Sequence, residues 1–112
     1  MSKRRMKDNN KTMMYLKAAE SLYAGNELDN EEIERLRWVG SELEKVLNFM
    51  NFVSSDLAIN NDLNSYLQIH IYQIQEACET GIVPNFVTET RKYCQKLGDS
   101  YLEQIKTNSA IN

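Results

Sequence analysis

The sequence predicts an all-α protein, an antiparallel up-down four-helix bundle. Four stretches carry apolar residues spaced three and four apart, which is typical of helices with one buried face. A single proline and four glycines are too few for the many turns of a β-sandwich or barrel. The breaks between the first two and the last two stretches are short, so the helices that they join must run antiparallel.

The chain length predicts one domain. Its 112 residues, 42% of them hydrophobic and 26% charged, are ordinary values for a single globular unit. We expect this helical-bundle domain to span residues 11–106, between a basic flexible N-terminal arm at 1–10 and a frayed tail at 107–112.

The first helix is expected from about residue 11 to Tyr23. Gly25 and Asn26, which adopt left-handed backbone conformations readily, then stop it. Its predicted buried face consists of apolar residues at helical spacing, namely Met13, Leu16, Ala19, Leu22 and Tyr23.

The second helix has the clearest start signal in the chain. Asp29 can cap the helix, and Glu32, three residues later, can bond back to the Asp29 amide. The helix should therefore begin at Asn30. Gly40 lies on its apolar seam and predicts a close approach of a neighbouring helix. The seam comprises Ile33, Leu36, Gly40, Leu43, Leu47 and Met50.

Residues 54–61 are rich in capping side chains and predict either a connection or a broken helix start. The third helix is expected over about 61–80 and ends at Gly81, and Pro84 opens the fourth. The inward residues of the third helix are Leu63, Leu67, His70, Ile71, Ile74, Ala77 and Cys78. Those of the fourth are Val87, Thr90, Cys94, Leu97, Tyr101 and Ile105.

The two cysteines predict free, buried thiols. In an antiparallel pair of the last two helices, Cys78 and Cys94 are offset by about 10 Å along the axis, which exceeds disulfide reach. No CxxC spacing, signal peptide or apolar run long enough for a membrane span is present. These features favour a reducing, cytoplasmic location.

The charge distribution does not favour nucleic-acid binding. Residues 1–11 carry a formal charge of +4, and the rest of the chain carries −7. The basic arm could touch phosphates of nucleic acid or anionic lipid, but a solvated terminus explains it as well. An acidic body is a poor platform for DNA.

No combination of residues predicts catalysis, a metal or a cofactor. His70 is the only histidine, and no second histidine or cysteine stands at the helical spacing that a metal site needs. It lies about 12 Å along the helix from Cys78, too far for a nucleophile–base pair, so a core histidine is the favoured interpretation. The glutamates of the second helix are typical of a solvated face and of a first turn that complements the helix dipole.

Three aromatic residues of the second helix point away from its apolar seam. Trp38, Phe49 and Phe52 predict either a second packed side of a central helix or a surface for a partner. Ile69 and Tyr72 likewise point away from the apolar face of the third helix. Two helices with spare apolar faces suggest a groove that accepts a partner helix. The candidate partner-binding residues are Trp38, Phe49, Phe52, Ile69 and Tyr72.

The stretch from Asp62 to Ala77 resembles the third helix of the flagellin export chaperones (the FliS family). Leu63, Tyr66 and Leu67 occupy the places of a leucine followed by an aromatic or leucine pair, and Glu76-Ala77 those of an acid–alanine pair. Leu97 and Tyr101 fall where the family usually has a leucine and a tryptophan. Residues 16–20, followed by Gly25 and Asn26, are similar to the end of an earlier family helix. The family's N-terminal tyrosine-bearing stretch and its Thr-Ala-Ser-Pro helix start have no counterpart here.

The resemblance implies a cytoplasmic chaperone without cofactor or turnover, which covers a helical C-terminal segment of flagellin before export. The sequence thus predicts a non-enzymatic protein-binding module, most simply an export chaperone or adaptor. The alternative is a small helical immunity or anti-defence protein that binds one protein target. The sequence does not indicate the oligomeric state.

Overall fold

A computed structural model describes residues 6–53 and 57–111, with side chains described for 11–52 and 64–106. The described chain contains four α-helices and no strand. They are α1 (Met6–Ser21), α2 (Asn30–Val53), α3 (Leu57–Thr80) and α4 (Thr88–Ile111). The all-α, four-helix prediction is confirmed.

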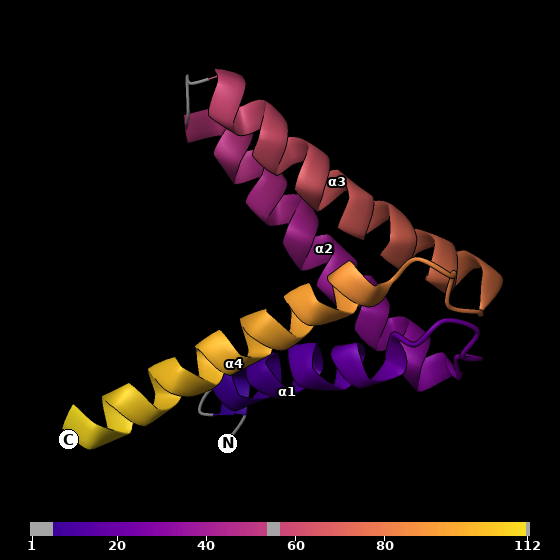
Figure 1. The fold of residues 1–112 in the computed structure, drawn as a ribbon. Coiled ribbons are helices and arrows are strands. Elements are labelled where there is room, and N and C mark those ends of the chain that lie inside the picture. The colour runs from indigo at the N-terminus through magenta and orange to yellow at the C-terminus, as the bar shows by residue number, and fades with distance from the viewer. Residues whose placement is uncertain (1–5, 54–56, 112) are drawn as a thin grey trace.

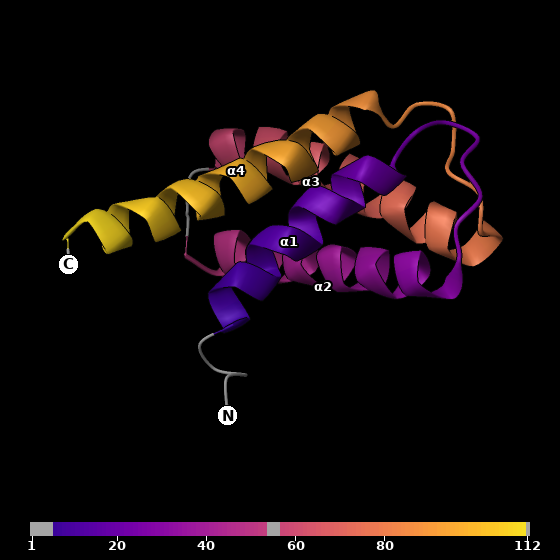
Figure 2. The ribbon, with the colours of Figure 1, turned by 90° about the horizontal axis from the view of Figure 1, so that it is seen from below.

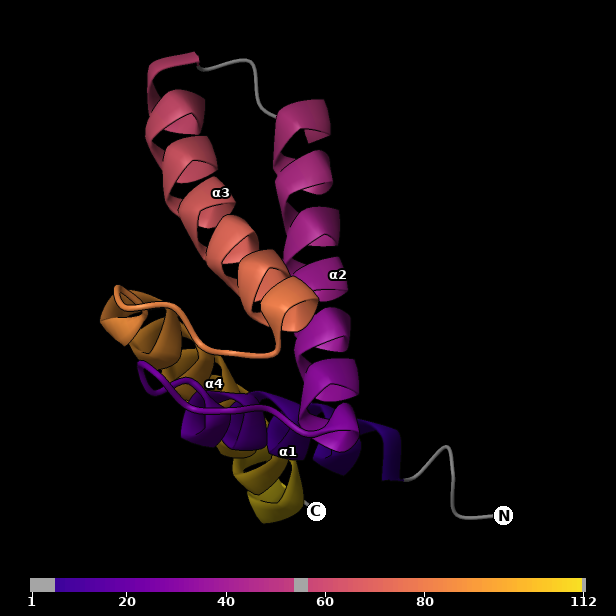
Figure 3. The ribbon, with the colours of Figure 1, turned by 90° about the vertical axis from the view of Figure 1, so that its right-hand side faces the viewer.

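The helices pack as two antiparallel pairs, α1 with α4 and α2 with α3 (Figure 1). Within the first pair Tyr15 stacks on Tyr101, with ring centroids 5.6 Å apart. Within the second the Asn64 amide donates to the Asn51 side-chain oxygen at 2.8 Å. The pairs diverge from one another, and the ends of α2 and α3 near residues 53 and 57 extend away from α1 and α4 (Figures 1 and 3). Consecutive helices are therefore antiparallel neighbours along their length only in the α2–α3 pair.

The connections 22–29 and 81–87 run side by side at one end of the molecule (Figures 2 and 3). The Gly25 amide donates to the Val83 carbonyl and the Val83 amide to the Asn26 carbonyl, both at 2.9 Å. The Leu28 amide donates to the Gly81 carbonyl, also at 2.9 Å. When the two connections pack on the core, these bonds satisfy backbone N–H and C=O groups that would otherwise be buried without a hydrogen-bond partner.

The pairing of the two connections corrects one prediction. Pro84 does not open the fourth helix, which begins at Thr88. The backbone before Thr88 is held by the other connection, and Val83 and Val87 are buried at 1% exposure each. A proline is compatible with a helix start, but it is equally compatible with this extended segment.

The predicted start of α2 is confirmed in detail. The Glu32 amide donates to the Asp29 carboxylate at 2.8 Å, and the Asp29 amide donates to the Glu32 carboxylate at 3.0 Å. Helix α1 begins at Met6, earlier than the expected residue 11, and α3 begins at Leu57, earlier than the expected 61. Gly25 and Gly81 have positive φ, as their roles as helix stops require.

The core lies where the two pairs meet, and it contains most of the predicted seams. The predicted residues of α2, α3 and α4 whose side chains are described are all buried or half-buried. Leu63 lies outside the residues whose side chains are described.

The buried face of α1 corrects the prediction. Met13 and Tyr23 are exposed, whereas Tyr15 and Ala18 are buried beside Ala19 and Leu22. Helix α1 packs on both α4 and α2, so its buried stripe is wider and rotated relative to the one that spacing alone indicates.

The domain boundaries stay predictions. Of the basic arm and the tail, residues 1–5 and 112 lie outside the described residues, and so do the side chains of 6–10 and 107–111. The backbone of both segments is helical where it is described, because α1 starts at Met6 and α4 ends at Ile111.

Candidate partner-binding surface

The five predicted partner-binding residues occupy three different places. Trp38 lies between α2 and α1, where its ring meets the Tyr15 ring edge-on with centroids 5.3 Å apart. It is half-buried and packs against the core. Trp38 therefore belongs to a second packed side of α2, the first of the two alternatives, because α1 crosses the side of α2 on which Trp38 lies.

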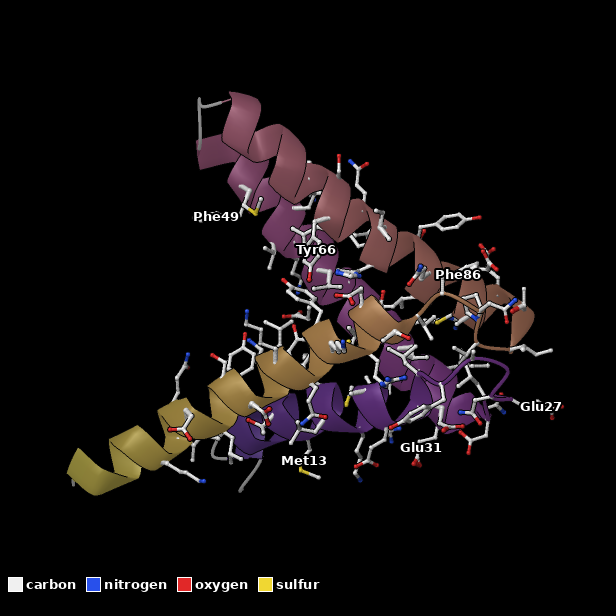
Figure 4. All side chains as sticks on the ribbon, viewed as in Figure 1. Met13, Glu27, Glu31, Phe49, Tyr66 and Phe86 are labelled. Atoms are coloured by element: carbon white, nitrogen blue, oxygen red, sulfur yellow. The ribbon has the colours of Figure 1, made fainter. Side chains whose placement is uncertain are left out.

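Phe49 and Phe52 lie beyond the part of α2 that α1 covers. The Lys11 Nζ atom lies 3.9 Å from Oε1 of Glu42, which places the N-terminal part of α1 near the middle of α2. Phe49, almost two turns further along α2, is 65% exposed and Phe52 is 87% exposed. Phe49 lies well away from Phe86, near the far end of the α2–α3 pair (Figure 4).

Ile69 and Tyr72 line an open cleft on the outer side of α3. They are 55% and 65% exposed, and they stand one helical turn apart. The cleft has a volume of about 600 Å³, and Pro84, Asn85 and Phe86 form its opposite wall. We call this site the α3 cleft. Its complete lining is Ser65, Gln68, Ile69, Tyr72, Gln73, Glu76, Pro84, Asn85 and Phe86.

The connection 81–87 explains why an aromatic ring faces this cleft. Val83 and Val87 both point into the core, and the segment between them must bulge outward. Phe86 is left 84% exposed at the rim of the cleft (Figure 4). An exposed phenylalanine on a connection held by backbone hydrogen bonds is a large apolar contact that loses little entropy when a partner covers it.

Glu76 is the only charged side chain in the lining of the α3 cleft. Glu76 lies near the Tyr72 hydroxyl, and the interaction with its carboxylate raises the pKa of Tyr72 above its ordinary value. Tyr72 therefore presents a neutral ring. The cleft offers an apolar strip with a polar rim and one negative charge.

Beneath the cleft, a buried hydrogen-bond chain joins α3 to α4. The Thr90 hydroxyl donates to the Gln73 side-chain oxygen at 2.6 Å, so it accepts from Nδ1 of His70 at 2.7 Å. His70 is 1% exposed and lies against the rings of Tyr66 and Tyr93. Burial lowers the pKa of His70, and the nearby Glu89 partly opposes this. The prediction of a core histidine is confirmed.

The described residues hold no group of three or more acidic, histidine or cysteine side chains placed to bind a metal ion. Both cysteines are free, as predicted. Burial raises the pKa of Cys94 to about 12, which keeps this thiol protonated and unreactive. Cys78 is only half-buried, and its thiol donates to the Ile33 carbonyl at 3.6 Å.

Sequence reasoning missed Phe86. The prediction that Pro84 opens the fourth helix places the residues after it at helical spacing. Val83 and Val87 stand on either side of Pro84 and Phe86. Two apolar residues placed in this way around a proline could have indicated a loop anchored at both ends. The structure brings Phe86 together with Ile69 and Tyr72, and it leaves Phe49 and Phe52 outside the cleft lining.

Comparisons with known proteins add no relative. No protein-family model matches the chain, and no curated protein or solved structure shows significant similarity to it. Among the helices of the described chain, none combines the length and the apolar character needed to cross a membrane.

Proposed function

We propose that this protein is a non-enzymatic binding module that holds an apolar helical segment of another protein in the α3 cleft. The observation that carries the proposal is the cleft itself, in which Ile69, Tyr72 and Phe86 stay more than half exposed. Exposed apolar side chains that converge on one concavity are typical of partner sites, whereas scattered ones need no explanation.

The spacing in the cleft suits a helix. Ile69 and Tyr72 lie one turn apart on α3, and Phe86 faces them from the connection. Two apolar side chains from successive turns of a partner helix can lie between these walls, in the helix-in-groove mode. Covering one large apolar side chain contributes about 1.5–3 kcal/mol before the costs of association.

The rim limits which partners fit. Gln68 and Gln73 can bond to polar groups that flank the apolar side chains, and Glu76 favours a positive charge nearby. We propose a cytoplasmic export chaperone or adaptor, with the C-terminal helical segment of flagellin as the partner. This choice rests on the sequence resemblance described above and on the shape of the cleft.

A peptide titration tests the proposal. A fluorescently labelled peptide of the flagellin C-terminal segment should bind the protein, and Phe86→Ser and Tyr72→Ser should each weaken binding at least tenfold. Met13→Ser is the matched control, because Met13 is an exposed apolar side chain of α1 outside the cleft. Binding that is unaffected by both cleft variants would place the site elsewhere, and no binding by the unmodified protein would exclude flagellin as the partner.

A further inference from the structure

The end of the α2–α3 pair is a helical hairpin without a second layer. We call the segment formed by residues 46–53 of α2 and 57–64 of α3 the distal hairpin. Helices α1 and α4 lie against the other end of the pair, and the distal hairpin extends beyond them (Figures 1 and 3). Two antiparallel helices do not enclose a core alone, because each buries its apolar stripe only against the other.

The side chains of the distal hairpin show this lack of cover. Leu47 and Met50 belong to the α2 seam but are only half-buried, whereas Leu43 one turn earlier is fully buried. Val46, Phe49 and Phe52 are exposed at successive turns. They are three of the ten large exposed apolar residues among the described side chains.

The chain exposes more surface than a compact monomer of its mass. The chain exposes 7877 Å², whereas a compact monomer of 13.0 kDa is expected to expose about 6,300 Å². Its radius of gyration of 15.1 Å likewise exceeds the value of about 13 Å expected for a compact domain of this length. Both values describe the whole chain, and the distal hairpin is one of the parts that extend from its packed region (Figure 1). A stable interface of standard size needs about 800 Å² from each partner.

The charge pattern points to a particular occupant. Residues 46–75 contain no lysine or arginine and only two acids, Asp56 and Asp62, although the whole chain has 13 basic and 16 acidic residues. A two-fold interface places each surface patch against its own copy, so like charges within the patch would face each other. A patch with few charges limits this repulsion, and the centres of such interfaces are depleted of charge.

We infer that the distal hairpin is a self-association surface, and that two copies pair their distal hairpins into a four-helix bundle around a two-fold axis. The second copy supplies the missing layer and buries Phe49 and Phe52. This surface lies outside the α3 cleft, so the inference does not depend on the proposed function.

Sedimentation velocity from about 1 to 200 µM protein tests the inference, because the dimer population rises with concentration. The unmodified protein should approach twice its monomer mass of 13.0 kDa. Phe49→Lys and Phe52→Lys should each raise the dimer dissociation constant at least tenfold. Both side chains are exposed, so the helical circular dichroism spectrum should not change.

Two variants with the same charge change serve as controls. Met13→Lys on α1 and Tyr72→Lys in the α3 cleft should leave the dimer intact. All four variants reduce the net charge of −3, so a weaker dimer cannot result from overall repulsion. A monomer at every concentration would overturn the inference. So would a dimer that Tyr72→Lys dissociates and Phe52→Lys does not.

Discussion

The two helix pairs are built differently, although each consists of two antiparallel helices. The α1–α4 pair is closely packed: Ala19 and Cys94 are fully buried, and a Cβ atom added to Gly98 would lie 2.5 Å from the Leu16 side chain. The α2–α3 pair is looser, since a Cβ atom on Gly40 would meet Ile74 at an ordinary 3.4 Å. The first pair encloses one end of the second, whose other end is left with exposed aromatic rings. The difference indicates that α1 and α4 close the core, while α2 and α3 also leave large apolar side chains exposed.

The largest effect is expected where the two pairs meet. Trp38→Ser removes a ring that packs on Tyr15 and the core, and should lower the free energy of unfolding by about 2–4 kcal/mol. Phe49 lies on the same side of α2 but beyond the part that α1 covers. Phe49→Ser should therefore change the free energy of unfolding by less than about 0.5 kcal/mol. Urea denaturation at about 1 µM protein, where self-association contributes little, measures both. Equal losses would show that the exposed end of α2 is as important for folding as the covered end.

A smaller effect distinguishes the close helix contact in the α1–α4 pair from the looser one in the α2–α3 pair. Gly98→Ala places a methyl group 2.7 Å from Leu16 Cγ and 3.3 Å from its backbone nitrogen, so α1 and α4 must move apart. We expect a loss of about 1–3 kcal/mol in the free energy of unfolding, despite the better helix propensity of alanine. Gly40→Ala is the matched control: its methyl group has room, and propensity should make it neutral or stabilising by up to about 1 kcal/mol. The comparison fails if Gly40→Ala is the more damaging variant in urea denaturation.

Local sequence signals predicted the parts of the fold that local interactions determine. The Asp29–Glu32 capping box lies within four residues, and it fixed the start of α2 correctly. The seams of α2 to α4 also followed from spacing. Gly98 was missed because its role depends on Leu16, which lies 82 positions away in the chain and meets Gly98 only when α1 pairs with α4.

The candidate site was predicted in part for the same reason. Ile69 and Tyr72 were found because exposure on a helix follows from its periodicity. Phe86 was missed because its position depends on hydrogen bonds between two connections that are distant in sequence. Trp38 and Phe49 share one side of α2, and only the path of α1 separates the half-buried ring from the exposed one.

The smallest expected effect concerns His70, at the contact between α3 and α4. Burial lowers the pKa of His70 in the folded protein, so below its ordinary value of 6.5 the unfolded chain binds a proton that the folded chain does not. The stability that the neutral imidazole contributes is therefore fully present above about pH 6.5 and is lost as the pH falls below it. Protonation would also place a second N–H on Nε2, which has no hydrogen-bond partner among the described residues. Urea denaturation between pH 7.5 and 5.5 should show stability falling with acidification by at most about 1.4 kcal/mol per pH unit, the limit for one proton. His70→Gln should flatten that slope whatever its own stability, whereas an unchanged slope would assign the acid sensitivity to groups elsewhere than this contact.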